Sequence, residues 1–140
     1  MDKKVEETIA AIQSTLHDSL EPVLIPDLNG FQRKQIHRHF ENSLEYRVKA
    51  YRELEDVVLK IYPVGQLKRL AEMKAQEVIM KGESEILPPM GAYERFVIHD
   101  YLKDRDGIKT ESYGEGKDRH IEISPHFGRM PKKAKRRLTR

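Results

Sequence analysis

The stretch ILPPMGAYERFVIHDYLKDRDGIKTESYGEGKDRHIEISP, residues 86–125, decides the fold because the chain carries a second version of it. Residues 24–63 read LIPDLNGFQRKQIHRHFENSLEYRVKAYRELEDVVLKIYP and align with it at a shift of 62 positions without a gap. Nine of the forty aligned pairs are identical, and several others exchange one apolar residue for another. A repeat of this length indicates a small domain rather than the unit of a solenoid.

Hydrophobic spacing and turn residues predict the same order of elements in both halves: helix, strand, helix, strand, strand. The first half places them at 3–20, 23–25, 29–42, 46–51 and 57–61, and the second at 66–81, 85–87, 92–103, 108–113 and 119–124. Asn29 is expected to cap its helix, and Gly82 to end the long one. The sequence therefore predicts an α+β fold of two α-β-α-β-β units.

An Arg and a His four positions apart recur at the same place in both copies, as Arg33 with His37 and Arg95 with His99. Such residues are neighbours one turn apart on a helix. A guanidinium donates two hydrogen bonds to a phosphate, and an imidazole donates to a phosphate oxygen or stacks on a base. Because the pair occurs twice, a phosphate-binding role is favoured over chance.

The helical angle of about 100° per residue places Arg95 and His99 together, on the side opposite Tyr93. We expect this side to face solvent and the apolar side to face the core. The alternative is that Arg95 forms a salt bridge with a neighbouring acid, Glu94 or Asp100, while His99 only fills an edge. In the first copy, the same geometry predicts that Phe31 and Ile36 face inward and that Arg33 and His37 point outward.

Three segments closely resemble the R-three-H domain in the version found in bacterial Jag-type proteins: LPPMGAYERFVIH at 87–99, TESYGEG at 110–116 and RHIEI at 119–123. The resemblance covers residues 66–125. It implies a small three-stranded sheet with helices on one face, which binds single-stranded nucleic acid. It also implies that Arg95 and His99 lie on the binding surface and that Arg119 is an accessory contact.

The chain departs from the Jag pattern because no KH-like Gly-x-x-Gly element precedes the domain. A divergent copy at residues 4–63 takes that place. Arg52 and Leu54 stand where the second copy has Gly114 and Gly116, so the glycine-rich turn is lost. Val57 likewise replaces Arg119. Arg33 and His37 remain, and the first copy either binds nucleic acid as well or only completes the core.

The charge of the chain is divided unevenly. Residues 126–140 contain no acid and seven basic side chains, whereas the other 125 residues hold 19 basic and 23 acidic groups, a balance of −4. Such a tail is expected to be flexible and to contact phosphate backbones, although it could act only as a solubilising end. Its candidate nucleic-acid contacts are Phe127, as a base-stacking residue, and the basic residues Arg129, Lys132, Lys133, Lys135, Arg136 and Arg137. The expected organisation is thus 1–63, 64–125 and a disordered basic tail at 126–140.

Other classes of site have little support. The chain has no cysteine, so disulfides, thiolate metal sites and cysteine nucleophiles are excluded, which suits the cytoplasm. No apolar run is long enough for a membrane span. His37 and His39 are two apart and point to different sides of a helix, so no metal is expected. No catalytic arrangement or cofactor motif stands out, and we expect a non-enzymatic protein. The repeated tyrosines, Tyr51 and Tyr113, are expected to pack in the core or between the two units rather than to stack on bases.

These features predict a protein that binds single-stranded nucleic acid, RNA rather than DNA, through the backbone with little sequence preference. The main alternative is a protein-interaction module, associated with a ribosome or another ribonucleoprotein complex, whose acidic body binds protein while the tail contacts RNA. A further alternative is a purely structural pair of copies, with the two Arg/His pairs buried against each other.

Overall fold

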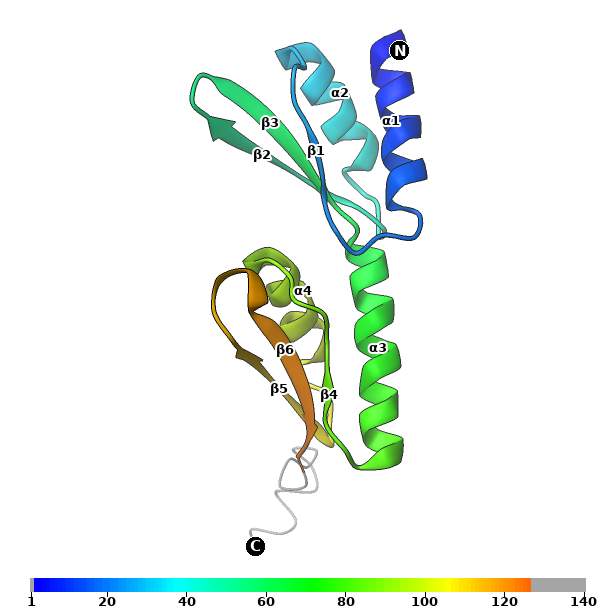
Figure 1. The fold of residues 1–140 in the computed structure, drawn as a ribbon. Coiled ribbons are helices and arrows are strands. Elements are labelled where there is room, and N and C mark those ends of the chain that lie inside the picture. The colour runs from blue at the N-terminus through cyan, green and yellow to red at the C-terminus, as the bar shows by residue number, and fades with distance from the viewer. Residues whose placement is uncertain (1, 127–140) are drawn as a thin grey trace, which may run out of the picture. The chain divides into compact units, whose positions relative to one another are not determined.

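The computed structural model describes residues 2–126, and Figure 1 shows the order of helices and strands along the chain. The chain divides into two units between Leu67 and Lys68, within helix α3. The first unit contains α1 (Lys3–Leu16), β1 (Val23–Ile25), α2 (Gly30–Phe40), β2 (Arg47–Glu53) and β3 (Asp56–Tyr62). The second contains most of α3 (Val64–Lys81), then β4 (Glu85–Ile86), α4 (Ala92–Leu102), β5 (Ile108–Tyr113), the 3-10 turn η1 (Gly116–Asp118) and β6 (His120–Pro125). The predicted α+β fold of two α-β-α-β-β units is confirmed.

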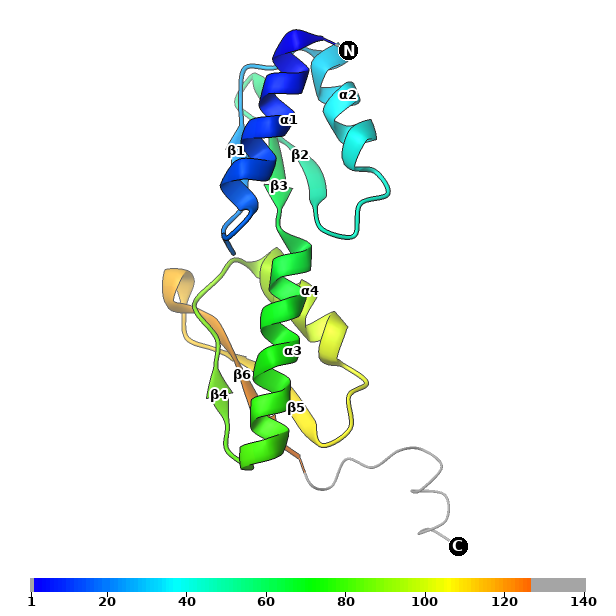
Figure 2. The ribbon, with the colours of Figure 1, turned by 90° about the vertical axis from the view of Figure 1, so that its right-hand side faces the viewer.

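Each unit has a three-stranded antiparallel sheet in which the last strand is central. The strand order is β1-β3-β2 in the first unit and β4-β6-β5 in the second. The registers also correspond, because Ala50 pairs with Leu59 as Ser112 pairs with Ile121. Within each unit the helices cover one face of the sheet, as Figures 1 and 2 show from two sides. The small sheet with helices on one face is the architecture that the resemblance implied.

Each unit buries its own apolar face between helices and sheet. In the first unit, Val5, Ile9, Ile12 and Leu16 of α1 recur at helical spacing and are buried. They pack in a core with residues of α2 and the strands, which are Leu28, Ile36, Phe40, Val48, Leu59 and Ile61. In the second unit the buried residues include Ala71, Ala75, Val78, Leu87, Val97, Ile98, Leu102, Ile108, Ile121 and Ile123.

Side-chain caps fix the helix starts in the first unit. Asn29 accepts a hydrogen bond from Gln32 N at 2.8 Å, and the Gln32 side chain accepts one from Asn29 N at 3.0 Å. This reciprocal pair satisfies backbone donors that the first turn of a helix leaves free, and it confirms the predicted cap. At the end of α3, Gly82 has a φ of 71°, and its N–H donates to Val78 O. The predicted glycine stop is therefore also confirmed.

Several side-chain and boundary predictions were wrong. Helix α1 ends at Leu16 rather than near Leu20, because the Ser19 hydroxyl bonds Glu21 backbone groups in a turn. Phe31 is 63% exposed, since the buried face of α2 is formed by Gln32, Ile36 and Phe40. The two repeated tyrosines are not core residues either.

Tyr51 and Tyr113 are 41% and 44% exposed. Their hydroxyls bond Tyr62 and Glu111, respectively, so each ring stands on the sheet with its polar end at the surface. Tyr51 lies within β2, opposite Val58, and Tyr113 is the last residue of β5, opposite His120. Neither ring belongs to the buried core.

None of the helices in residues 2–126 has the length and apolar character needed to cross a membrane. The predicted flexible tail, with Phe127 and the basic residues after it, lies outside the described residues.

Candidate nucleic-acid interface

Arg95 and His99 lie one turn apart on α4, at the border between its buried and exposed sides. The buried residues of α4 are Glu94, Val97, Ile98 and Leu102. Both Arg95 and His99 are half-buried rather than fully exposed. We expected both side chains to face solvent fully, and this was wrong because each is only half exposed. Leu102 extends the buried face of α4 to within about 20° of Arg95 on the helical wheel.

The imidazole of His99 is held against strand β5 by two hydroxyl groups. Its Nδ1 lies 2.7 Å from Thr110 Oγ1, and its Nε2 lies 2.9 Å from Ser112 Oγ. Thr110 and Ser112 are two apart on a strand and therefore point to the same side of the sheet. A neutral imidazole has one donor and one acceptor, so it donates to one hydroxyl and accepts from the other.

The surroundings of His99 favour the neutral ring. Burial lowers the pKa of His99, and the positive charges of Arg95 and Arg119 lower it further. Two guanidinium groups therefore lie close enough to His99 to act on its protonation. The site combines these two fixed cations with a neutral imidazole at neutral pH.

The guanidinium of Arg95 lacks partners for part of its hydrogen-bonding capacity. Its Nε and one terminal nitrogen are buried, and no acceptor for either exists among the described residues. The predicted alternative of a salt bridge to Asp100 is not observed there, because the Asp100 carboxylate instead lies 3.1 Å from Lys103 Nζ. Glu94 is buried, with its carboxylate against Gly91 at the start of the helix. An unpaired buried donor costs free energy, so these nitrogens favour the arrival of an acceptor.

The turn before β6 places the third basic residue. Arg119 donates to Gly114 O at 2.9 Å, and this bond fixes its guanidinium beside the turn. Gly114 has a φ of 90°, and a Cβ there would lie 2.9 Å from Asp118 O. Only glycine fits this backbone without displacement. The glycine in the sequence motif therefore positions Arg119 near the other two residues.

The first unit keeps the Arg/His pair but not its surroundings. Arg33 is half-buried, and its guanidinium donates to Leu28 O at 2.5 Å. His37 is exposed. The positions that correspond to Thr110 and Ser112 are Val48 and Ala50, which offer no hydroxyl to an imidazole.

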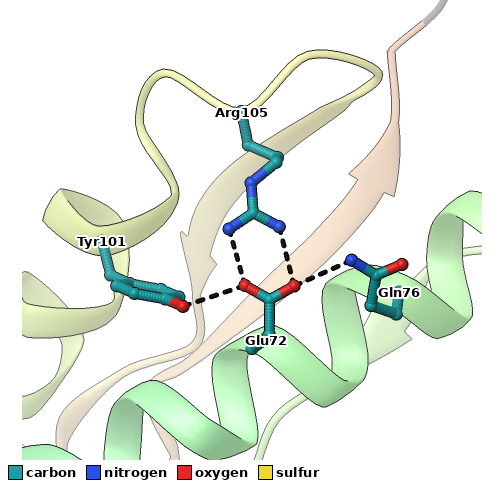
Figure 3. Close-up of polar contacts among 4 residues, drawn as sticks. All are labelled: Glu72, Gln76, Tyr101 and Arg105. Carbon is teal, nitrogen blue, oxygen red and sulfur yellow. Dashed lines mark hydrogen bonds and ion pairs between the residues drawn. The ribbon is translucent and has the colours of Figure 1, made fainter.

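A carboxylate network, drawn in Figure 3, joins α3 to α4 and the loop after it. Glu72 accepts two hydrogen bonds from Arg105, at 2.6 and 3.0 Å, one from Tyr101 at 2.9 Å and one from Gln76 at 2.8 Å. These bonds, with that of Arg105 foremost, lower the pKa of Glu72 to about 2. The network braces the helix that carries Arg95 and His99.

Sequence reasoning missed both the Glu72 network and the hydroxyl groups around His99. Glu72 and Arg105 are 33 positions apart, which no helical spacing relates. The available signal for the hydroxyl groups around His99 was that Thr110 and Ser112 are two positions apart on a predicted strand. Among residues 2–126, no three His, Asp or Glu side chains are grouped as a metal site requires.

Residues 65–125 match the R-three-H domain family. This segment is an R-three-H domain. The match includes the Arg/His pair on α4, the Gly114 turn and Arg119, whereas residues before 65 lie outside it.

Two relatives resemble the R-three-H segment, and both are named RNA-binding protein KhpB. The one from Lactiplantibacillus plantarum is 44% identical over 54 residues, which are 39% of this chain and 16% of the relative. The one from Bacillus subtilis is 43% identical over 60 residues, which are 41% of this chain and 29% of the relative. The aligned segment thus spans less than a third of either relative.

Proposed function

We propose that this chain binds single-stranded nucleic acid, RNA in preference to DNA, through its R-three-H domain. The named relatives of this domain are RNA-binding proteins, which supports a binding protein rather than an enzyme. The proposed contacts are directed to the phosphate backbone, so little sequence preference is expected.

The observation that carries the proposal is the unneutralised guanidinium of Arg95. Two of its nitrogens have no acceptor among the described residues, while the side chain as a whole is partly exposed. A small rotation of its flexible stem would bring these donors to a phosphate oxygen at the surface. A guanidinium binds phosphate through paired hydrogen bonds, which suits a backbone contact.

His99 and Arg119 have different proposed roles. Both ring nitrogens of His99 are engaged by Thr110 and Ser112, so the imidazole holds these two hydroxyls in place instead of acting as a cation. Neutral hydroxyls beside a guanidinium are suited to the 2′-OH and phosphate oxygens of RNA. Arg119 extends the positively charged surface along the sheet. The basic residues of 126–140 add electrostatic attraction.

The test measures fluorescence anisotropy of a labelled single-stranded RNA, the same sequence as DNA, and the matching duplex. The Arg95→Ala variant is expected to bind the single strand more weakly and to reduce the dependence of log affinity on log salt by about 1. Lys81→Ala, an exposed lysine at the end of α3, removes the same charge and is the control. Equal binding by Arg95→Ala and Lys81→Ala would refute the assignment.

A chain truncated after Pro125 separates the contribution of the tail. If the truncated chain loses all binding while Arg95→Ala loses none, the tail alone is the binder. A full chain that binds naked RNA weakly, yet co-purifies with a protein complex after nuclease treatment, would support the alternative of a protein-interaction module.

A further inference from the structure

The two units differ at the place where the Arg/His helix faces the sheet. In the second unit, Thr110 and Ser112 hold the imidazole against β5. In the first unit, Val48 and Ala50 occupy those positions, and neither side chain can form a hydrogen bond. His37 is exposed.

The first unit has an open groove at this place. Its volume is about 420 Å³, and it is lined by Arg33, Lys34, His37, Arg38, Glu41, Ala50 and Leu59. Ala50 and Leu59 are paired across β2 and β3, and Ala50 is the exposed apolar side chain of the lining, whereas Leu59 is buried beneath it. The volume is within the range of small-ligand sites, about 300–1,000 Å³. The groove is therefore large enough for a nucleotide.

The rim of the groove is cationic. It carries Arg33, Lys34 and Arg38 against the single carboxylate of Glu41. Lys34 and Arg38 are exposed and one turn apart on α2, and neither has an ion-pair partner in the part of the chain that the structure describes. The bond from Arg33 to Leu28 O uses only one of its terminal nitrogens. The groove thus presents unpaired positive charge beside an apolar surface.

We infer that this groove is a second binding site for single-stranded nucleic acid, separate from the R-three-H site. One base lies on the exposed Ala50, above the buried Leu59, and the flanking phosphates contact Lys34 and Arg38. His37, an exposed residue of the groove lining, stacks on a base or donates to a phosphate oxygen. A nucleotide is favoured over an acidic peptide because it combines a flat apolar face with adjacent negative charge. The inference shares its ligand class with the proposed function but uses no residue of the R-three-H domain.

The experiment uses the full chain carrying Arg95→Ala and His99→Ala, which removes the Arg/His pair of the R-three-H domain. Adding Lys34→Ala and Arg38→Ala is expected to weaken binding of a fluorescein-labelled single-stranded RNA and to lower the salt slope by about 2. The matched control adds Arg47→Ala and Arg52→Ala, two exposed arginines of β2 that do not line the groove. If both sets of variants bind equally, general charge explains the binding and the inference is overturned.

A second measurement locates the ligand on the wild-type chain. Amide chemical shifts are followed by NMR during titration with inorganic phosphate, with adenosine monophosphate, with polyglutamate and with the RNA strand. The inference expects the RNA to shift the amides of Lys34, Arg38, Ala50 and Leu59, with phosphate alone affecting only the rim. Unchanged Ala50 and Leu59 amides with RNA, or equal shifts with polyglutamate, would overturn it.

The two measurements also distinguish this inference from the proposed function. Failure of the R-three-H site alone would leave wild type and the Arg95→Ala, His99→Ala chain equal, while the groove variants still lose affinity. Failure of the groove alone would leave the effect of Arg95→Ala intact.

Discussion

The imidazole Nε2 of His99 lies 2.9 Å from the hydroxyl of Ser112, and this bond ties helix α4 to strand β5. Together with the bond from Nδ1 to Thr110, it leaves the ring no free nitrogen. In the proposed function, the histidine therefore acts through its neighbours, and the guanidinium of Arg95 is the group expected to contact the ligand.

Replacing Ser112 by alanine should release one side of the His99 ring. One hydrogen bond in a half-buried site is worth about 1 kcal/mol, so the free energy of unfolding should fall by about that amount. The ring should also gain solvent, which relieves the burial that lowers its pKa, and its NMR titration should move upward. Thr8→Ala is the control, because its hydroxyl bonds only Lys4 O on the exposed side of α1. A His99 titration identical to that of wild type would show that Ser112 does not hold the ring.

The lowered pKa of His99 also gives stability a pH dependence. A histidine whose pKa is lower in the folded chain than the unfolded value of about 6.5 favours the folded state when neutral. Its contribution is fully present above about pH 6.5 and is lost as pH falls from there toward the folded pKa. The melting temperature of wild type should therefore drop more between about pH 7.5 and about pH 5.5 than that of His99→Gln. Parallel curves would contradict a buried neutral ring.

The glycine of the turn before β6 can be tested against another glycine in the same domain. Gly107 and Gly114 have similar φ values, 87° and 90°, so alanine is strained at both. Only at Gly114 would the new Cβ meet backbone, with Asp118 O at 2.9 Å, whereas nothing lies within 4 Å at Gly107. Gly107→Ala should cost about 1 kcal/mol of stability, and Gly114→Ala should cost more. Gly114→Ala should also weaken RNA binding, since it displaces Arg119.

Chemical denaturation of the two variants gives the stability comparison. The same proteins in the anisotropy assay give the binding comparison. Equal losses in both assays would mean that the turn tolerates the Cβ by shifting without consequence for Arg119.

The sequence predicted the fold well because a repeated pattern of apolar residues and turns determines each element locally. Asn29 and Gly82 mark helix ends with side-chain and backbone features that need no distant partner. The orientation of α4 was less predictable. A helical wheel gives the angles between residues but not which side of the helix packs on the sheet. In the structure Leu102 is buried, so the buried side of α4 extends toward Arg95.

The candidate site was identified by residue type and could not be assembled from the sequence. The pairing of His99 with Thr110 and Ser112 depends on which strand lies under α4. His37 is exposed in the first unit, where Val48 and Ala50 occupy the positions that correspond to Thr110 and Ser112. The aligned copies show that hydroxyl residues in the second unit are replaced by apolar residues in the first. The sheet register is needed to show that these positions correspond in the two folded units.

The Glu72 network should make the second unit sensitive to acid. The pKa of Glu72 in the folded chain, about 2, is below the ordinary value of 4.5, so the ionised carboxylate stabilises the fold. This contribution is fully present above about pH 4.5 and is lost as pH falls toward about 2. Because the side chains of Glu72 and Arg105 are 35% and 29% exposed, solvent screens the pair, and Arg105→Gln should cost about 1 kcal/mol at neutral pH.

The measurement is the free energy of unfolding of wild type and Arg105→Gln at several pH values. The difference between them should shrink as the solution is made more acidic, because protonated Glu72 no longer distinguishes the two chains. Glu83→Gln, an exposed carboxylate after α3, should leave the acid sensitivity unchanged. A difference that stays constant down to about pH 2 would mean that Arg105 stabilises α4 through packing on Tyr101, whose ring lies 5.8 Å from its guanidinium carbon, and not through the charge of Glu72.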